Sequence, residues 1–143
     1  MRDTIDYRRH VDPEYRRWGR KYPRFPGVAE CVRLLNEGNA RGAWVDIITH
    51  ELTENARECL PDLVAVFRSD VRESVRLIVL MSVVEAALPA AIPFLAEVVG
   101  ERHPRFSQYA EQGLLAIGTR ESRAALWDAS HREPGAAPDP AVG

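Results

Sequence analysis

The first 24 residues combine arginine with aromatic side chains, which are the residue types that hold a nucleic-acid strand. This segment contains eight Lys/Arg and four Asp/Glu, a net charge of +4, whereas residues 25–143 contain eleven and seventeen, a net charge of −6. Aromatic rings can stack on bases while cationic side chains contact phosphates. The candidate nucleic-acid contacts in this arm are Arg8, Arg9, Arg16, Arg17, Trp18, Arg20 and Lys21.

The chain also contains residue types that bind metal ions or act as nucleophiles. His50-Glu51 resembles the start of a zinc-protease motif, but the residue four positions after His50 is Glu54 rather than a second histidine. Two ligands on one helix face do not hold a metal ion. Cys31 and Cys59 lack metal-ligand spacing and lie at or beside apolar core positions. The sequence therefore predicts no metal, no cofactor and no catalytic residue.

The elements that position these side chains follow from an apolar pattern that recurs every 32 residues. The three sets are Val28, Cys31, Val32, Leu34, Leu35; then Leu60, Leu63, Val64, Val66, Phe67; then Ile92, Leu95, Ala96, Val98, Val99. The spacing i, i+3, i+4, i+7 lines one face of a helix. Each set is followed by a turn signal and a second helical pattern. We therefore expect three helix pairs, stacked so that they share one core.

Two of these pairs resemble a known family. Leu60-Pro61-Asp62-Leu63-Val64-Ala65-Val66-Phe67 followed by Asp70-Val71-Arg72-Glu73-Ser74-Val75 resembles a HEAT repeat. Ala91-Ile92-Pro93-Phe94-Leu95 followed by Tyr109-Ala110-Glu111-Gln112-Gly113-Leu114 resembles a second copy. The resemblance covers residues 27–130. The stretch Ile48-Thr49-His50-Glu51-Leu52-Thr53-Glu54-Asn55-Ala56 also resembles small bacterial proteins of this type. The resemblance implies an all-α fold, a right-handed, armadillo-like α-solenoid of about three antiparallel helix pairs, and a usual role in protein recognition.

The same resemblance implies a role for two polar residues. In the family pattern an Asp in the turn and an Arg on the second helix support neighbouring units, and Asp70 and Arg72 match this in the middle unit. Gly38 and Ala40 stand at the corresponding places of the first unit. Asp70 also suits a helix N-cap.

The domain organisation follows from the repeat. We expect a basic and aromatic cap or arm over residues 1–26, a repeat domain over 27–130 and a disordered tail over 131–143. The helix pairs are expected at about 27–53, 54–88 and 89–118, with a truncated terminal helix at 122–130. Gly38, Gly100 and Gly118 suit the left-handed residue that ends a helix. Leu77 to Val99 is too interrupted by Glu85, Pro89 and Pro93 to be a membrane span.

Two surfaces remain as binding candidates. A solenoid needs capping at its ends, so we favour a cap over residues 1–26, with its aromatic rings covering the open end of the stack. The second surface is the concave row of second helices. Its candidate partner contacts are Trp44, Arg41, Glu73, Arg76, Gln108, Tyr109 and Glu111. An exposed Trp and Arg there would act as binding anchors, whereas a packed Trp44 would not.

These observations favour a non-enzymatic, cytoplasmic protein that binds another protein through the concave face. One specific version is an immunity or antidote protein, because an acidic body complements a basic toxin. The alternative is a nucleic-acid-binding or DNA-repair protein, by analogy with HEAT-like DNA glycosylases, that uses the Arg/aromatic arm. No membrane partner is expected, and the sequence does not give the oligomeric state.

Overall fold

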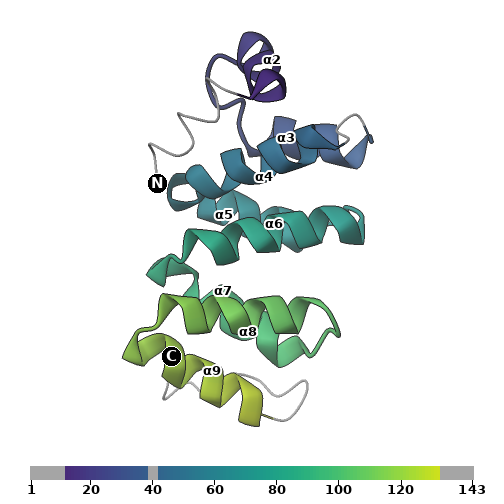
Figure 1. Cartoon of the computed structure of the whole chain (residues 1–143). Helices are drawn as coiled ribbons and strands as arrows, with labels where there is room; N and C mark the ends of the chain where they lie inside the picture. Colours follow the sequence, from purple (N-terminus) through teal and green to yellow (C-terminus); the bar gives the residue numbers. More distant parts are fainter. Residues whose placement is uncertain (1–11, 39–41, 133–143) are drawn as a thin grey trace. The chain divides into compact units, whose positions relative to one another are not determined.

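The computed structural model describes residues 12–38 and 42–132, and these ranges are helical throughout apart from the connections (Figure 1). They contain eight α-helices, one 3₁₀ helix and no strand. The predicted all-α class is therefore confirmed, while the right-handed solenoid stays a prediction. The chain divides into two compact units, Met1–Ser82 and Val83–Gly143.

The described part of the first unit contains five helices, one of them from the N-terminal segment. Its helices are α2 (Pro13–Lys21), α3 (Val28–Asn36), α4 (Ala43–Glu54), α5 (Ala56–Phe67) and α6 (Glu73–Ala86), whose last turn belongs to the second unit. Helix α3 falls within the expected range 27–53, α4 extends one residue beyond that range to Glu54, and α5 and α6 fall within 54–88. Helices α3, α4 and α5 pack on one another, and α2 packs on α4.

Helix α2 has clear start and stop signals in the sequence. The Asp12 carboxylate accepts hydrogen bonds from the backbone N–H groups of Glu14 and Tyr15, and Pro13 occupies the first turn, where its missing N–H has no cost. Arg20 and Lys21 stand in the last turn, where positive charge is favourable. The basic segment is therefore ordered as a helix from its N-cap onward.

The repeated apolar residues form the faces of these helices that point into the core. All five residues of the first set are buried in α3. In α5, Leu63 and Phe67 are buried, while Leu60, Val64 and Val66 are half-buried. The predicted spacing therefore identifies the inward faces of both helices.

Arg72, directly before α6, makes hydrogen bonds to the C-terminal end of α3. Its Nη2 donates to the carbonyl of Leu35 at 2.6 Å, and its backbone N–H donates to Oδ1 of Asn36 at 3.4 Å. The carbonyl of Leu35 also accepts a hydrogen bond from the backbone N–H of Gly38. The predicted N-cap at Asp70 is wrong, because α6 begins at Glu73 and the residue directly before it is Arg72.

The second unit consists of the 3₁₀ helix η1 (Pro89–Ala91), α7 (Ile92–Glu101), α8 (Phe106–Ile117) and α9 (Arg120–His131), and its three α-helices pack pairwise. The third apolar set lies in α7, where all but the half-buried Ala96 are buried. The expected truncated helix at 122–130 is wrong in length. A capping box between Thr119 and Ser122 starts α9 at Arg120, so that α9 is 12 residues long, as is α8.

The glycine expectations are partly confirmed. Gly38 (φ 76°) and Gly118 (φ 69°) adopt the left-handed conformation after α3 and α8. Gly100 does not, because α7 continues to Glu101 and the left-handed residue is Arg102, whose N–H donates to the carbonyl of Val99.

No described helix has the length and apolar character that a membrane crossing requires. The apolar stretch that begins at Leu77 is divided, since α6 ends at Ala86 and η1 follows it.

Candidate functional site

The aromatic side chains of α2 belong to the core of the first unit. Tyr15 and Trp18 are each only 1% exposed. The Trp18 ring meets Trp44 of α4 edge to face, with 5.2 Å between the ring centroids, and lies 4.6 Å from Tyr22. Such contacts fix the position of α2 on α4 and leave its opposite face in water.

A buried polar contact accompanies this packing. The hydroxyl of Tyr15 donates to Oε2 of Glu51 at 2.8 Å, and Glu51 is 2% exposed. In the sequence, Glu51 stands out only as part of a metal motif, and this role was not predicted. A signal was present, because Glu51 lies four residues after Ile47 and three after Ile48, on the buried face of α4.

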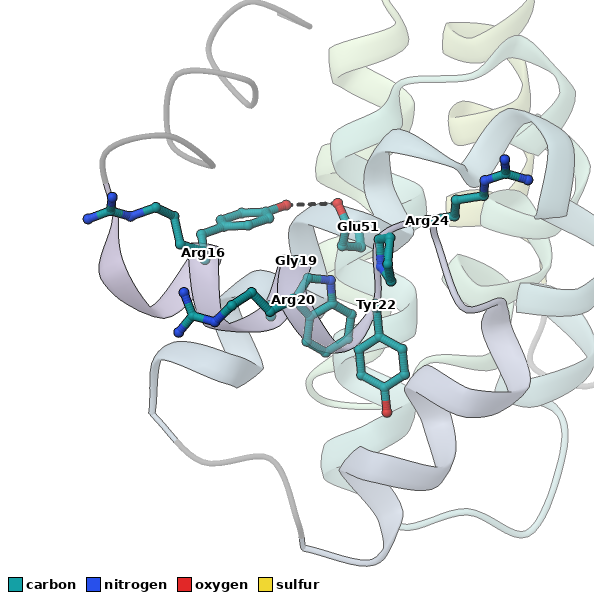
Figure 2. A pocket seen from close by; sticks show the side chains of 9 residues that line it. Arg16, Gly19, Arg20, Tyr22, Arg24 and Glu51 are labelled. Atoms are coloured by element: carbon teal, nitrogen blue, oxygen red, sulfur yellow. Dashed lines mark hydrogen bonds between the residues drawn. The ribbon is translucent and has the colours of Figure 1, made fainter.

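A cavity of about 340 Å³ opens beside this contact. Its lining residues are Tyr15, Arg16, Trp18, Gly19, Arg20, Tyr22, Pro23, Arg24 and Glu51. Figure 2 shows Arg16 and Arg20 extending to one side of Glu51 and Arg24 extending to the other. We call this cavity the arginine pocket. Arg24 was not among the predicted contacts, although it belongs to the same basic segment.

The charge around the arginine pocket is not neutralised by the described acidic residues. Residues 12–24 carry five Lys/Arg and two Asp/Glu. Asp12 caps α2, and Glu14 pairs with Arg17 at 3.1 Å. Arg16, Arg20 and Arg24 are exposed and have no ion pair with a described carboxylate. The pocket therefore presents a positive edge to an approaching ligand.

The wall that contains Tyr22 is held by a cluster on α3. The Tyr22 hydroxyl donates to Oε2 of Glu30 at 2.6 Å, and Nε of Arg33 donates to Oε1 of the same carboxylate at 2.6 Å. The hydrogen bonds from Arg33, which has the larger effect, and from Tyr22 lower the pKa of Glu30 to about 2. Desolvation is the main cause that raises the pKa of Tyr22, and the neighbouring Glu30 raises it further. The chain after α2 is thereby fixed against α3.

Two residues of the second helices, Trp44 and Arg76, were expected to anchor a partner. Both contact other residues of the first unit. Trp44 is half-buried and packs on Trp18. Arg76 is half-buried, its Nε donates to the carbonyl of Phe67 at 2.7 Å, and its guanidinium lies 4.5 Å from the Phe67 ring centroid. Both side chains therefore stabilise the first unit. Glu73 is exposed, and Arg41 lies outside the described residues.

The remaining predicted contacts divide between the units. On α8 of the second unit, Gln108 and Glu111 are exposed and Tyr109 is half-buried. In the first unit, Arg16, Arg17, Arg20 and Lys21 are exposed. Trp18 is buried and therefore presents no face on which a base could stack. Arg8 and Arg9 lie outside the described residues.

The two thiols are not activated. Desolvation raises the pKa of buried Cys31 to about 12, and desolvation also raises the pKa of half-buried Cys59. The thiolate is the reactive form of cysteine, so both side chains are poor nucleophiles at neutral pH. No group of three His, Cys, Asp or Glu in the described part of the chain could hold a metal ion.

Comparison of the chain with protein-family models, with curated proteins and with solved structures returns no match.

Proposed function

We propose that this chain is a non-enzymatic module that binds another protein, and that the binding surface is the exposed face of α2 around the arginine pocket. The observation that carries the proposal is the presence of three exposed arginines, Arg16, Arg20 and Arg24, around one cavity. Tyr15 and Trp18 hold the helix that presents the first two of them. A surface fixed before binding loses little entropy on binding.

Charge indicates the kind of partner. A positive surface accelerates association with a negative one and disfavours partners of like charge. An immunity or antidote role would use the acidic remainder of the chain and a basic toxin. The arginines of the pocket favour an acidic partner instead. The resemblance to HEAT repeats supports protein recognition in general and does not distinguish these cases.

The test is affinity capture from the cells in which the protein occurs, with two matched variants. We expect the wild-type chain and Arg17→Gln to retain the same partner. Arg17 is an exposed arginine of α2 that pairs with Glu14 and does not line the pocket. A variant with Gln at positions 16, 20 and 24 should lose this partner. Retention of an identical set of proteins by all three chains would contradict the proposal.

Binding to nucleic acid is the second candidate function, favoured by the same exposed guanidinium groups, which suit phosphates. It has less support because the aromatic rings of Tyr15 and Trp18 are buried. The measurement is fluorescence anisotropy with single-stranded and duplex DNA over a range of salt concentrations. Affinity that falls steeply with salt, and that the triple arginine variant lacks, would support this function.

A further inference from the structure

We infer that the arginine pocket accepts an extended acidic segment of the partner protein, with carboxylates on the arginines and backbone over the cavity. This inference rests on the proposed protein-binding function and specifies the chemistry of the partner.

The arrangement of the arginines indicates an elongated ligand. Arg16 and Arg20 extend on one side of Glu51, and Arg24 extends on the other (Figure 2). Recognition of one small anion uses donors that converge on it, as in a bidentate arginine pair. Here Arg24 extends away from Arg16 and Arg20, so the three side chains suit several negative charges separated along one chain. The cavity of about 340 Å³ between them is within the range of ligand sites.

The cavity walls favour a peptide over a nucleic-acid strand. Single strands are held by stacking their bases on aromatic rings. Of the three aromatic residues that line the cavity, Tyr15 and Trp18 are each 1% exposed, and Tyr22 is half-buried. The wall also contains the carboxylate of Glu51, which repels a phosphate at short range. A peptide backbone is neutral, so it can pass this carboxylate while its acidic side chains reach the arginines outside.

Gly19 leaves room for a chain to approach α2. It lies inside α2 and lines the pocket, and a Cβ added there would meet nothing within 4 Å. Because glycine has no side chain, the backbone of a ligand can come close to the helix at this position.

The test measures the binding of a fluorescein-labelled, capped hexaglutamate peptide by fluorescence anisotropy. The controls are a hexaglutamine peptide and a single-stranded oligothymidylate with the same label. We expect hexaglutamate to bind, hexaglutamine not to bind, and oligothymidylate to bind more weakly than hexaglutamate. Binding of oligothymidylate as tightly as hexaglutamate, or no binding of hexaglutamate, would overturn the inference.

Two pairs of variants locate the binding. Arg20→Gln and Arg24→Gln should each weaken hexaglutamate binding by about threefold, the scale of one exposed charge contact. The matched control Arg17→Gln should leave it within about 1.5-fold. Equal weakening by Arg17→Gln would show that hexaglutamate is attracted by the general positive charge of α2. It would contradict binding at the arginine pocket. Arg20 and Arg24 are exposed, so these variants should fold normally.

The second pair fills the space beside Gly19. Gly19→Ala and Gly19→Leu both raise helix propensity, but only leucine extends into the cavity. We expect Gly19→Ala to bind hexaglutamate within about twofold of wild type and Gly19→Leu to bind at least about tenfold more weakly. Full binding by a folded Gly19→Leu would contradict the inference.

If the whole chain captures a protein partner that Gly19→Leu also retains, the acidic-segment inference fails while the proposed function stands. If nothing is captured, the proposed function itself fails.

Discussion

The hydroxyl of Tyr15 and the carboxylate of Glu51 form a buried hydrogen bond of 2.8 Å that joins α2 to α4. The two residues are 36 positions apart in the chain, and each is at most 2% exposed. A buried carboxylate is costly unless donors compensate for its lost hydration. The bond therefore both satisfies Glu51 and fixes the helix that carries Arg16 and Arg20.

Tyr15→Phe tests this contact. The variant keeps the ring but removes a donor from a buried carboxylate, so the free energy of unfolding should fall by about 1–3 kcal/mol. Urea unfolding followed by circular dichroism measures the change. Tyr109→Phe is the control, because Tyr109 is half-buried and no hydrogen bond of its hydroxyl occurs within the described residues. Equal stability of Tyr15→Phe and wild type would show that the bond contributes nothing to stability.

The Glu30 cluster predicts a dependence of stability on pH. Arg33 and Tyr22 lower the pKa of Glu30 to about 2, so folding favours the ionised carboxylate. Its contribution is fully present above the ordinary Glu pKa of about 4.3 and is lost as the pH falls toward 2. The stability difference between wild type and Glu30→Gln should therefore shrink between pH 6 and pH 2, measured by urea unfolding at each pH. In an Arg33→Gln background this pH dependence should be much weaker. An unchanged difference across the range would contradict the prediction.

The apolar spacing predicted the helices well because helix faces are local. The first two sets, which begin at Val28 and Leu60, identify the inward faces of α3 and α5, and the set that begins at Ile92 does the same for α7. Each face depends only on residues within two turns of one another. Local signals failed at helix ends. Gly100 is a residue type typical of a helix end, but α7 continues through it to Glu101.

The pocket could not be predicted, because it depends on which helix α2 covers. An amphipathic arm with Tyr15 and Trp18 on one face is compatible with a free stacking surface and with a packed cap. The contact of Trp18 with Trp44 and the bond of Tyr15 to Glu51 show that this face is packed on α4. The same contact leaves Trp44 half-buried. Arg24 and Glu51 line the same cavity only because α2 packs on α4. The sequence shows that both residues are charged, but not that they lie close together.

His103 predicts a second local determinant of stability. Its Nδ1 accepts hydrogen bonds from the backbone N–H groups of Arg105 and Phe106, at 3.1 and 3.2 Å, at the start of α8. His103→Ala should lower the free energy of unfolding by about 1 kcal/mol, the usual scale for a lost N-cap. His103→Asn keeps an acceptor near the same position and should recover most of this loss. Thermal unfolding of the three proteins measures the effect, and equal losses in both variants would assign the stabilisation to the stacking of His103 on Phe106 instead.

Gly113 predicts a steric limit within the second unit. A Cβ at this position would lie 3.0 Å from Cγ2 of Val84 and 3.1 Å from Cδ1 of Leu95. Overpacking of this kind costs about 1–3 kcal/mol, which exceeds the gain of about 1 kcal/mol in helix propensity. Gly113→Ala should therefore lower stability. Gly100→Ala is the control for propensity alone, since its Cβ would meet nothing within 4 Å, and it should be neutral or stabilising.

A double variant separates the steric cost at Gly113 from any other effect of the substitution. Val84→Ala removes one of the two close atoms, so Gly113→Ala should cost less in that background than in wild type. The coupling in this cycle measures the contact directly because the two residues touch. Additive losses would mean that Val84 does not limit the side chain at 113, and the close approach of α8 would then depend on Leu95 of α7.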